Sequence, residues 1–171
     1  MPFTPVHMGP GLLIKAMLQS SFSLMVFGWS QIVMDIQPLI VLITGEGHLH
    51  GFTHTYIGAT LLGIFAGVSG KYLSEIGLGI LHLNPRDLFG IGNKLTVSWW
   101  VAMLSALLGS FSHVMLDSIM HSDLQPFSPF NLDNDLLGII SVNSLHQMCL
   151  YSGVVGAVVY YILLFRHRKR G

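Results

Sequence analysis

The sequence has few charged residues for its length. Asp, Glu, Lys and Arg together make up 9% of its 171 residues, whereas about 25% is usual in soluble globular domains. A soluble chain this short exposes too much surface to be covered by so few charges. The formal net charge is zero, so nothing in the charge balance indicates nucleic acid as a partner.

Cysteine is almost absent, and basic residues are absent from the N-terminal stretch. The one cysteine, Cys149, excludes an intrachain disulfide and cannot build a thiolate zinc site alone. It lies in an apolar run, where we expect it to pack as a small hydrophobic side chain. No lysine or arginine precedes Lys15, so the chain does not begin like a cleaved signal peptide. We therefore expect residues 1–171 to form one mature integral-membrane domain.

Apolar residues are abundant and are arranged in long runs. Hydrophobic residues make up 51% of the chain, and the mean hydropathy is +0.63. A transmembrane helix needs about 20 mostly apolar residues. The segments that meet or approach this length lie near residues 22–43, 52–69, 97–119 and 146–165. The sequence thus predicts an all-α, polytopic membrane helix bundle with about four transmembrane helices.

Two features complicate the first span. Asp35 and Pro38 interrupt its apolar run, and proline breaks the local helical hydrogen bonding and biases Gln37 away from helix. Before this span lies a shorter apolar piece at residues 11–19. It is expected to lie in the membrane interface or to form a half-hairpin with the next helix.

Basic residues predict the orientation, because cytoplasmic loops are enriched in lysine and arginine. With the basic run Arg166–Arg170 in the cytoplasm and four spans, the segment Lys71–Lys94 is also inside and Lys15 lies near that side. The two remaining loops, near residues 44–52 and 120–145, contain neither lysine nor arginine. All eight basic residues thus fall on one side, which predicts a cytoplasmic C-terminus.

Histidines and acids gather in and near the two loops of the opposite side. His113 and Asp117 are four residues apart, so they project from one face of a helix, and His121 continues the stripe. His50 and His54 repeat this spacing where a loop becomes a helix. Each pair can offer nitrogen or oxygen donors to one metal ion. Such donor sets suit zinc, or iron or manganese at an open site.

The aspartates within the spans need a partner. An aspartate near the bilayer interior costs several kcal/mol unless it is paired or solvated. Asp35 and Asp117 therefore either pair with histidines, in a network that fastens helices together, or bind a cation.

The other polar residues of these loops leave alternatives open. Only one of His48 and His50 need face the site. His121 and Asp123 can be ligands, partners of ligands or solvated loop residues. The proline-bounded stretch Pro126–Phe130 is expected to cap the cluster, to line a lipid-facing entrance or to be a plain interfacial loop.

His7 reaches the cluster only with a particular topology. If residues 11–19 turn at the following serine pair and run antiparallel to the next helix, both arms are about 20 Å long. His7 then returns beside Asp35. The cost is Lys15 within the membrane, which is relieved if its amine extends to the inner interface.

The order of these motifs resembles a known family. It runs from His7-Met8-Gly9 through Asp35-x-x-Pro38 and His50-Gly-Phe-Thr-His-Thr55 to His113-x-x-x-Asp117 and then Pro126-Phe127. This order is similar to that of the YdjM-like family, described as LexA-binding, inner-membrane-associated hydrolases predicted to depend on a metal. The resemblance covers residues 7 to about 130.

The resemblance implies a metal site and a bacterial inner (cytoplasmic) membrane location. The residues that it places at the metal site are His7, Asp35, His54, His113 and Asp117. The family often has a second carboxylate where this chain has Gln37, and one of its histidines aligns with Leu49. The missing carboxylate counts against a two-metal site, unless His121 and Asp123 compensate for it.

The leading functional prediction is a membrane-embedded, metal-dependent hydrolase. A divalent ion, zinc before manganese or iron, would activate a water, and Asp117 or Asp123 would take its proton. A site near the outer leaflet favours a lipid or a lipid-linked ester or phosphoester as substrate. The full set of predicted metal ligands is His7, Asp35, His50, His54, His113, Asp117 and His121.

Two other functions remain open. A non-catalytic metal-binding or metal-transport protein would use the same residues, although the inner halves of the spans lack a polar stripe to conduct an ion. A structural homo-oligomer would use His–Asp pairs as fasteners and glycine-rich helix faces for association. Gly63, Gly67 and Gly70 fit close packing either within one chain or between chains.

Overall fold

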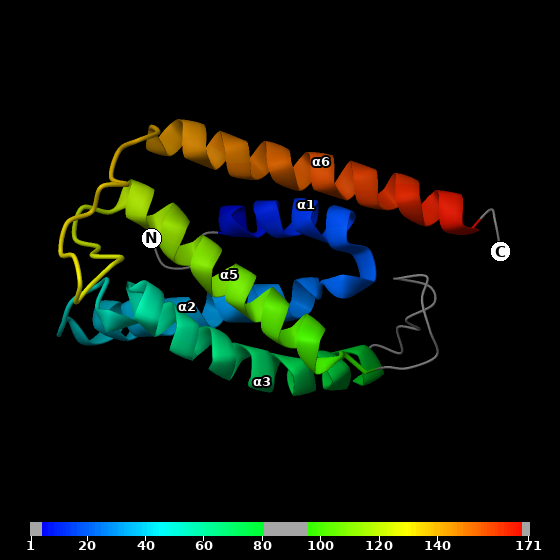
Figure 1. Ribbon diagram of the computed structural model, residues 1–171, viewed down its shortest axis with the longest axis horizontal. Helices are drawn as coiled ribbons and strands as arrows, with labels where there is room; N and C mark the ends of the chain where they lie inside the picture. Colours follow the sequence, from blue (N-terminus) through cyan, green and yellow to red (C-terminus); the bar gives the residue numbers. More distant parts are fainter. Residues whose placement is uncertain (1–4, 81–95, 169–171) are drawn as a thin grey trace.

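The computed structural model describes residues 5–80 and 96–168, and it is all-helical there, with no strand (Figure 1). The longer helices are α1 (Met8–Leu18), α2 (Leu24–Thr44), α3 (Tyr56–Ile80), α5 (Trp99–Met120) and α6 (Val142–Arg168). Three short 3-10 turns are η1 (Pro5–His7), η2 (Gln19–Ser21) and η3 (Phe52–His54). Helices α2, α3, α5 and α6 are long and apolar enough to cross a membrane. The predicted bundle of four spans and a short N-terminal helix is confirmed.

Two spans are longer than the hydropathy indicated. Helix α3 continues past the predicted end at residue 69 because the charges of Lys71 and Glu75 pair with each other one turn apart. Helix α6 begins four residues before the predicted start, where the Ser141 hydroxyl accepts a hydrogen bond from the backbone N–H of Ser144. Charged pairs and serine caps therefore place these helix ends, rather than the limits of the apolar runs. The predicted basic residues Arg86 and Lys94 lie outside the described residues.

Helix α2 is not interrupted by its proline. It runs unbroken through Pro38, and Gln37 is helical, so the expectation of a local break is wrong. Proline removes one backbone hydrogen bond, and packing against neighbouring helices holds the rest of a membrane helix in place. The helix ends at Gly45, whose φ of 73° suits glycine and whose N–H bonds to the Val41 carbonyl.

The N-terminal half-hairpin is present. Helix α1 runs antiparallel to α2 and is shorter, so its start lies partway along the bundle (Figure 1). Lys15 is only 5% exposed. Its amine donates to the backbone carbonyls of Gln19 and Phe22, both at 2.7 Å. Lysine thus satisfies two carbonyls of the turn that folds α1 back on α2.

Replacing Lys15 by methionine should lower the stability of the hairpin. Methionine keeps the apolar stem but leaves both carbonyls without this donor. Hydrogen bonds to charged groups contribute roughly 1.5–3 kcal/mol each, so we expect a loss of about 2 kcal/mol or more. Thermal unfolding of the purified protein in detergent measures it. Lys71→Met is the matched control, because its pair with Glu75 is one turn apart and partly exposed and should contribute well under 1 kcal/mol. Equal losses for the two variants would contradict this account.

The helices pack through glycine contacts within the chain. A Cβ atom at Gly63 or Gly67 would lie 2.7 Å from side-chain atoms of α5, and one at Gly70 would lie 2.9 Å from the Trp29 ring of α2. The three glycines therefore pack α3 against its own neighbours. Their close approach does not require a second copy of the chain.

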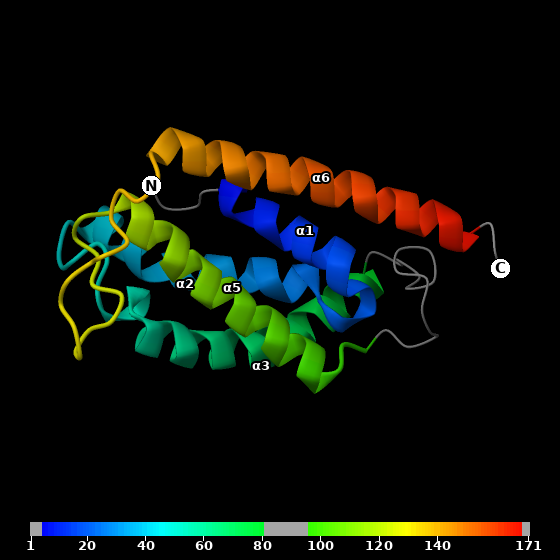
Figure 2. The ribbon, with the colours of Figure 1, turned by 45° about the horizontal axis from the view of Figure 1, so that its top comes forward.

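Helices α1 and α6 lie side by side with their backbones in close contact (Figure 2). A Cβ atom at Gly9 would lie 1.9 Å from the carbonyl oxygen of Cys149, and one at Gly156 would lie 2.4 Å from the backbone nitrogen of Leu13. The side chain of Cys149 is buried in an apolar cluster with Leu116, as expected for a small hydrophobe. The contact holds the start of α1, and with it His7, against the rest of the bundle.

Candidate metal centre

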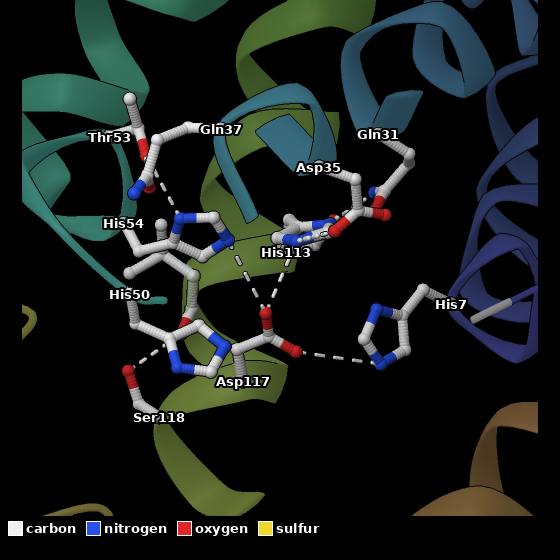
Figure 3. A network of polar contacts seen from close by, with 12 residues as sticks. His7, Gln31, Asp35, Gln37, His50, Thr53, His54, His113, Asp117 and Ser118 are labelled. Carbon is white, nitrogen blue, oxygen red and sulfur yellow. Dashed lines mark hydrogen bonds and ion pairs between the residues drawn. The ribbon is translucent and has the colours of Figure 1, made fainter. Parts of the chain in front are cut away.

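Histidines and aspartates from four elements converge at one end of the bundle (Figure 3). His7 precedes α1, Asp35 lies on α2, His54 ends η3, and His113 and Asp117 lie one turn apart on α5. We call these five residues the primary centre. None of them is more than 6% exposed. The structure thus brings together the five residues that the motif resemblance implied.

Local backbone contacts position His54 just before the N-terminus of α3. Its N–H bonds to the carbonyl of Gly51, and the N–H of Tyr56 bonds to the carbonyl of Pro126 at 2.8 Å. The ring of Phe127 packs on that of Tyr56 at 5.3 Å. The proline-bounded stretch therefore packs on the start of α3, two residues after His54.

The distances within the primary centre are those of ligands around an ion. His113 Nε2 lies 3.2 Å from Asp117 Oδ2 and 3.4 Å from Asp35 Oδ1. His54 Nε2 lies 3.6 Å from Asp117 Oδ2, and His7 Nε2 lies 3.9 Å from Asp117 Oδ1. Most of these exceed an ordinary N–H···O hydrogen bond, which ends near 3.2 Å. Zinc with bonds of about 2.0–2.1 Å in a tetrahedron separates its donor atoms by roughly 3.3 Å.

The three imidazole nitrogens that face the carboxylates have no hydrogen-bond partner among the described residues. Nε2 of His7, His54 and His113 is buried, and none of them makes a hydrogen bond to any residue that the structure describes. Leaving such an atom unsatisfied costs about 1–3 kcal/mol. His113 shares one group of possible metal donors with His7 and Asp117 and another with Asp35 and His54, so the residues fit a divalent metal.

Hydrogen bonds on the far side of His113 set its tautomer. Nδ1 of His113 lies 2.7 Å from Gln31 Oε1, and the amide nitrogen of Gln31 donates to the carbonyl of Gly109 at 2.9 Å. The amide oxygen can only accept, so Nδ1 carries the proton and Nε2 presents its lone pair to the centre. This is the usual arrangement of a metal-ligating histidine.

His54 is held in the same way by a longer chain of contacts. Its Nδ1 lies 3.1 Å from Thr53 Oγ1, and that hydroxyl donates to Gln37 Oε1 at 2.7 Å. The amide nitrogen of Gln37 donates to the carbonyl of His48. Burial lowers the pKa of His54 to about 3, so its imidazole is neutral and has a free lone pair. Gln37 therefore supports the loop that carries His54.

The sequence reasoning missed this supporting layer. The sequence pattern indicated no role for Gln31 or Thr53, and at the site it marked Gln37 only as the position of a missing carboxylate. Gln31 carried a signal, since it lies one turn before Asp35 on α2 and an amide inside a membrane helix needs a partner.

His50, His121 and Asp123 form a second cluster beside the primary centre. Nδ1 of His50 lies 2.9 and 3.0 Å from the two Asp123 oxygens. The rings of His50 and His121 stack with their centroids 4.3 Å apart. The side chain of His48 is exposed. Of the two histidines that competed for one role, His50 is therefore the one that faces the site.

The donor atoms of these residues form three overlapping groups, each within 4.8 Å. The groups are His7 with His113 and Asp117, Asp35 with His54 and His113, and His50 with Asp117 and His121. Asp117 belongs to the first and the third. All seven predicted metal ligands are thus found in at least one group.

The two predicted catalytic acids differ in their surroundings. Both oxygens of the buried Asp117 face histidine nitrogens, which suits a ligand. The side chain of Asp123 is 54% exposed. Burial opposes its ionisation, but the contact with His50 outweighs this and holds the pKa of Asp123 below its usual value. Asp123 is therefore an ionised carboxylate in contact with both solvent and the site.

Comparison with known proteins gives a family without a function. No curated protein and no solved structure matches the chain, and no named relative supports the resemblance to the YdjM-like family. One family model, described as "Domain of unknown function (DUF4184)", matches residues 1–171. The chain therefore belongs to the DUF4184 family.

Proposed function

We propose that this protein is a membrane-embedded, metal-dependent hydrolase acting on a lipid or a lipid-linked ester or phosphoester. The observation that carries the proposal is the set of three buried Nε2 atoms without hydrogen bonds, arranged around two carboxylates at ligand spacing. A network built only to fasten helices would gain most by pairing these nitrogens at ordinary hydrogen-bond distances.

The donor set favours zinc, with manganese or iron as alternatives. It consists of imidazole nitrogens and carboxylate oxygens, which suits these ions better than copper(I) or calcium. A zinc ion at such a centre would lower the pKa of a bound water to near neutral. The resemblance to the predicted YdjM-like hydrolases supports the same chemistry.

Different residues would bind the metal, orient its ligands and accept the proton during hydrolysis. The five residues of the primary centre would hold the ion, and Gln31 orients His113 through its Nδ1 proton. Asp123 is the acid that solvent reaches, so we assign it to take the proton of the attacking water. One of its two oxygens suffices for the contact with His50, which leaves the other for this task.

We place the primary centre at the non-cytoplasmic end of the bundle. Lys15 lies in the last turn of α1, and Lys71 and Arg166 lie in the C-terminal halves of α3 and α6. The C-terminal ends of these three helices point away from the loop that follows α5 (Figure 1). The positive-inside rule then puts the C-terminus in the cytoplasm, and the motif resemblance favours a bacterial inner membrane.

Exposed apolar side chains at the site end favour a lipid-like substrate. Phe52 is 58% exposed and lies two residues before His54. On the segment after α5, Phe130, Leu132 and Ile139 are 88%, 60% and 63% exposed. Side chains of this kind insert where headgroups meet acyl chains, which is where a lipid ester bond lies.

Removal of the metal tests the proposal. Purified protein should carry zinc or another divalent ion, measured by inductively coupled plasma mass spectrometry. It should release products from a panel of bilayer phospholipids, followed by lipid mass spectrometry. Treatment with dipicolinate should abolish turnover, and added Zn²⁺ should restore it.

Two results would overturn the proposal. One is full hydrolysis by the metal-free protein. The other is stoichiometric metal with ion uptake into sealed vesicles but no turnover of any phospholipid, which would favour transport. The His48→Ala variant is the control, because its side chain is exposed and its loss should leave both metal content and turnover unchanged.

A further inference from the structure

The second cluster contains the donor atoms of a separate metal site. Donor atoms of His50, Asp117 and His121 lie within 4.8 Å of one another. The His50 side chain is only 5% exposed although it belongs to a loop. Its ring stacks on His121 and meets His54 edge to face at 5.2 Å. Two imidazoles thus lie together beside a carboxylate that already belongs to the primary centre.

The tautomer of His50 is suited to metal binding. Its Nδ1 donates to the Asp123 carboxylate at 2.9–3.0 Å, so Nε2 presents a lone pair. A carboxylate that holds the far nitrogen of an imidazole is a recurrent feature of zinc-ligating histidines, and it raises the basicity of the ligand. Solvation of a surface histidine would not require this pairing.

The backbone that carries His121 is fixed. The side-chain amide of Asn134 donates to the carbonyls of Ser118 and His121, at 2.8 and 3.2 Å. The N–H of His121 bonds to the carbonyl of Asp117, and the N–H of Gly138 bonds to the carbonyl of Ile119. The long loop after α5 therefore closes over the helix end from which His121 projects, and the ligand is preorganised.

Asp117 is shared between the two sets of donors. It contacts the histidines of the primary centre through both oxygens, and it belongs to the group of His50 and His121. A carboxylate can bind one ion through each oxygen, and ions in two-metal hydrolytic sites lie about 3.5–4 Å apart. Gln37 replaces a carboxylate of the motif pattern, and the second cluster supplies donors on the other side of Asp117.

We infer that His50, Asp117 and His121 bind a second divalent metal ion, with Asp117 shared between the two ions. Asp123 acts on this ion through His50. The inference rests on the proposed primary centre, because the shared carboxylate is placed by the histidines of that centre. It adds a partner ion that stabilises charge on the opposite side of a scissile ester.

The test is metal stoichiometry in the full-length protein. Wild-type protein loaded with Mn²⁺ and then desalted should retain two ions per chain and should give the electron paramagnetic resonance spectrum of a magnetically coupled pair. His50→Ala and His121→Ala should each retain one ion with an uncoupled spectrum. Retention of that ion also shows that the variant is folded. His48→Ala, on the same loop, should keep both ions.

The outcomes separate this inference from the proposed function. One ion in the wild type, or two ions in both His50→Ala and His121→Ala, overturns the second site and leaves the primary centre standing. No stoichiometric ion in the wild type overturns both.

Discussion

Replacing Asp117 by asparagine should remove the metal and reduce turnover by about a thousandfold or more. Asparagine has nearly the same shape, so the packing of α5 is kept while the charge is lost. Asp117 lies within 3.2–3.9 Å of nitrogens from His7, His54 and His113. The three histidines of the primary centre thus all face the carboxylate of Asp117. A metal supplies several kcal/mol of transition-state stabilisation, and each 1.36 kcal/mol corresponds to tenfold in rate.

The measurements are metal content and initial rates on the best phospholipid substrate of the wild type. Asp133→Asn is the matched control, because Asp133 lies exposed on the loop after α5 and its loss should change neither quantity. An Asp117→Asn protein that unfolds at the wild-type temperature and keeps its ion would rule out Asp117 as a ligand. Retained turnover without an ion would rule out the metal-dependent mechanism itself.

A single methyl group at Gly9, a residue that offers no ligand atom, should also disable the primary centre. The added Cβ would lie 1.9 Å from the carbonyl oxygen of Cys149, and since both atoms are backbone or fixed to it, no side chain can move aside. Helix α1 must then shift away from α6. His7, two residues earlier, moves with it and loses its approach to Asp117.

We expect Gly9→Ala to cost roughly 1–3 kcal/mol of stability, as overpacking does, and to weaken metal binding about as much as His7→Ala does. Thermal unfolding and metal titration measure the two effects. Gly79→Ala is the control, because a Cβ there meets no atom within 4 Å. Alanine favours a helix over glycine, so this variant should be as stable as wild type or slightly more. Equal metal affinity in Gly9→Ala and wild type would show that His7 is not held by the α1–α6 contact.

Much of the primary centre followed from local rules. The spacing of His113 and Asp117 depends only on the helical repeat, and the cost of Asp35 in a membrane helix indicates that it has a partner. The return of His7 followed from counting residues in the hairpin. The hydrogen-bond partners of Lys15 did not, because they depend on how the chain turns at Gln19 and Phe22.

The sequence by itself determined that this chain forms helices long and apolar enough to cross a membrane, with most of the histidines and acids toward one end. It could do so because hydropathy and helical periodicity act on residues close together in the chain. The tertiary structure decided which nitrogen of each histidine faces the site. His113 takes its tautomer from Gln31, 82 residues away, and His50 takes its own from Asp123, 73 residues away. Such contacts depend on how helices and loops pack, which residue spacing does not determine.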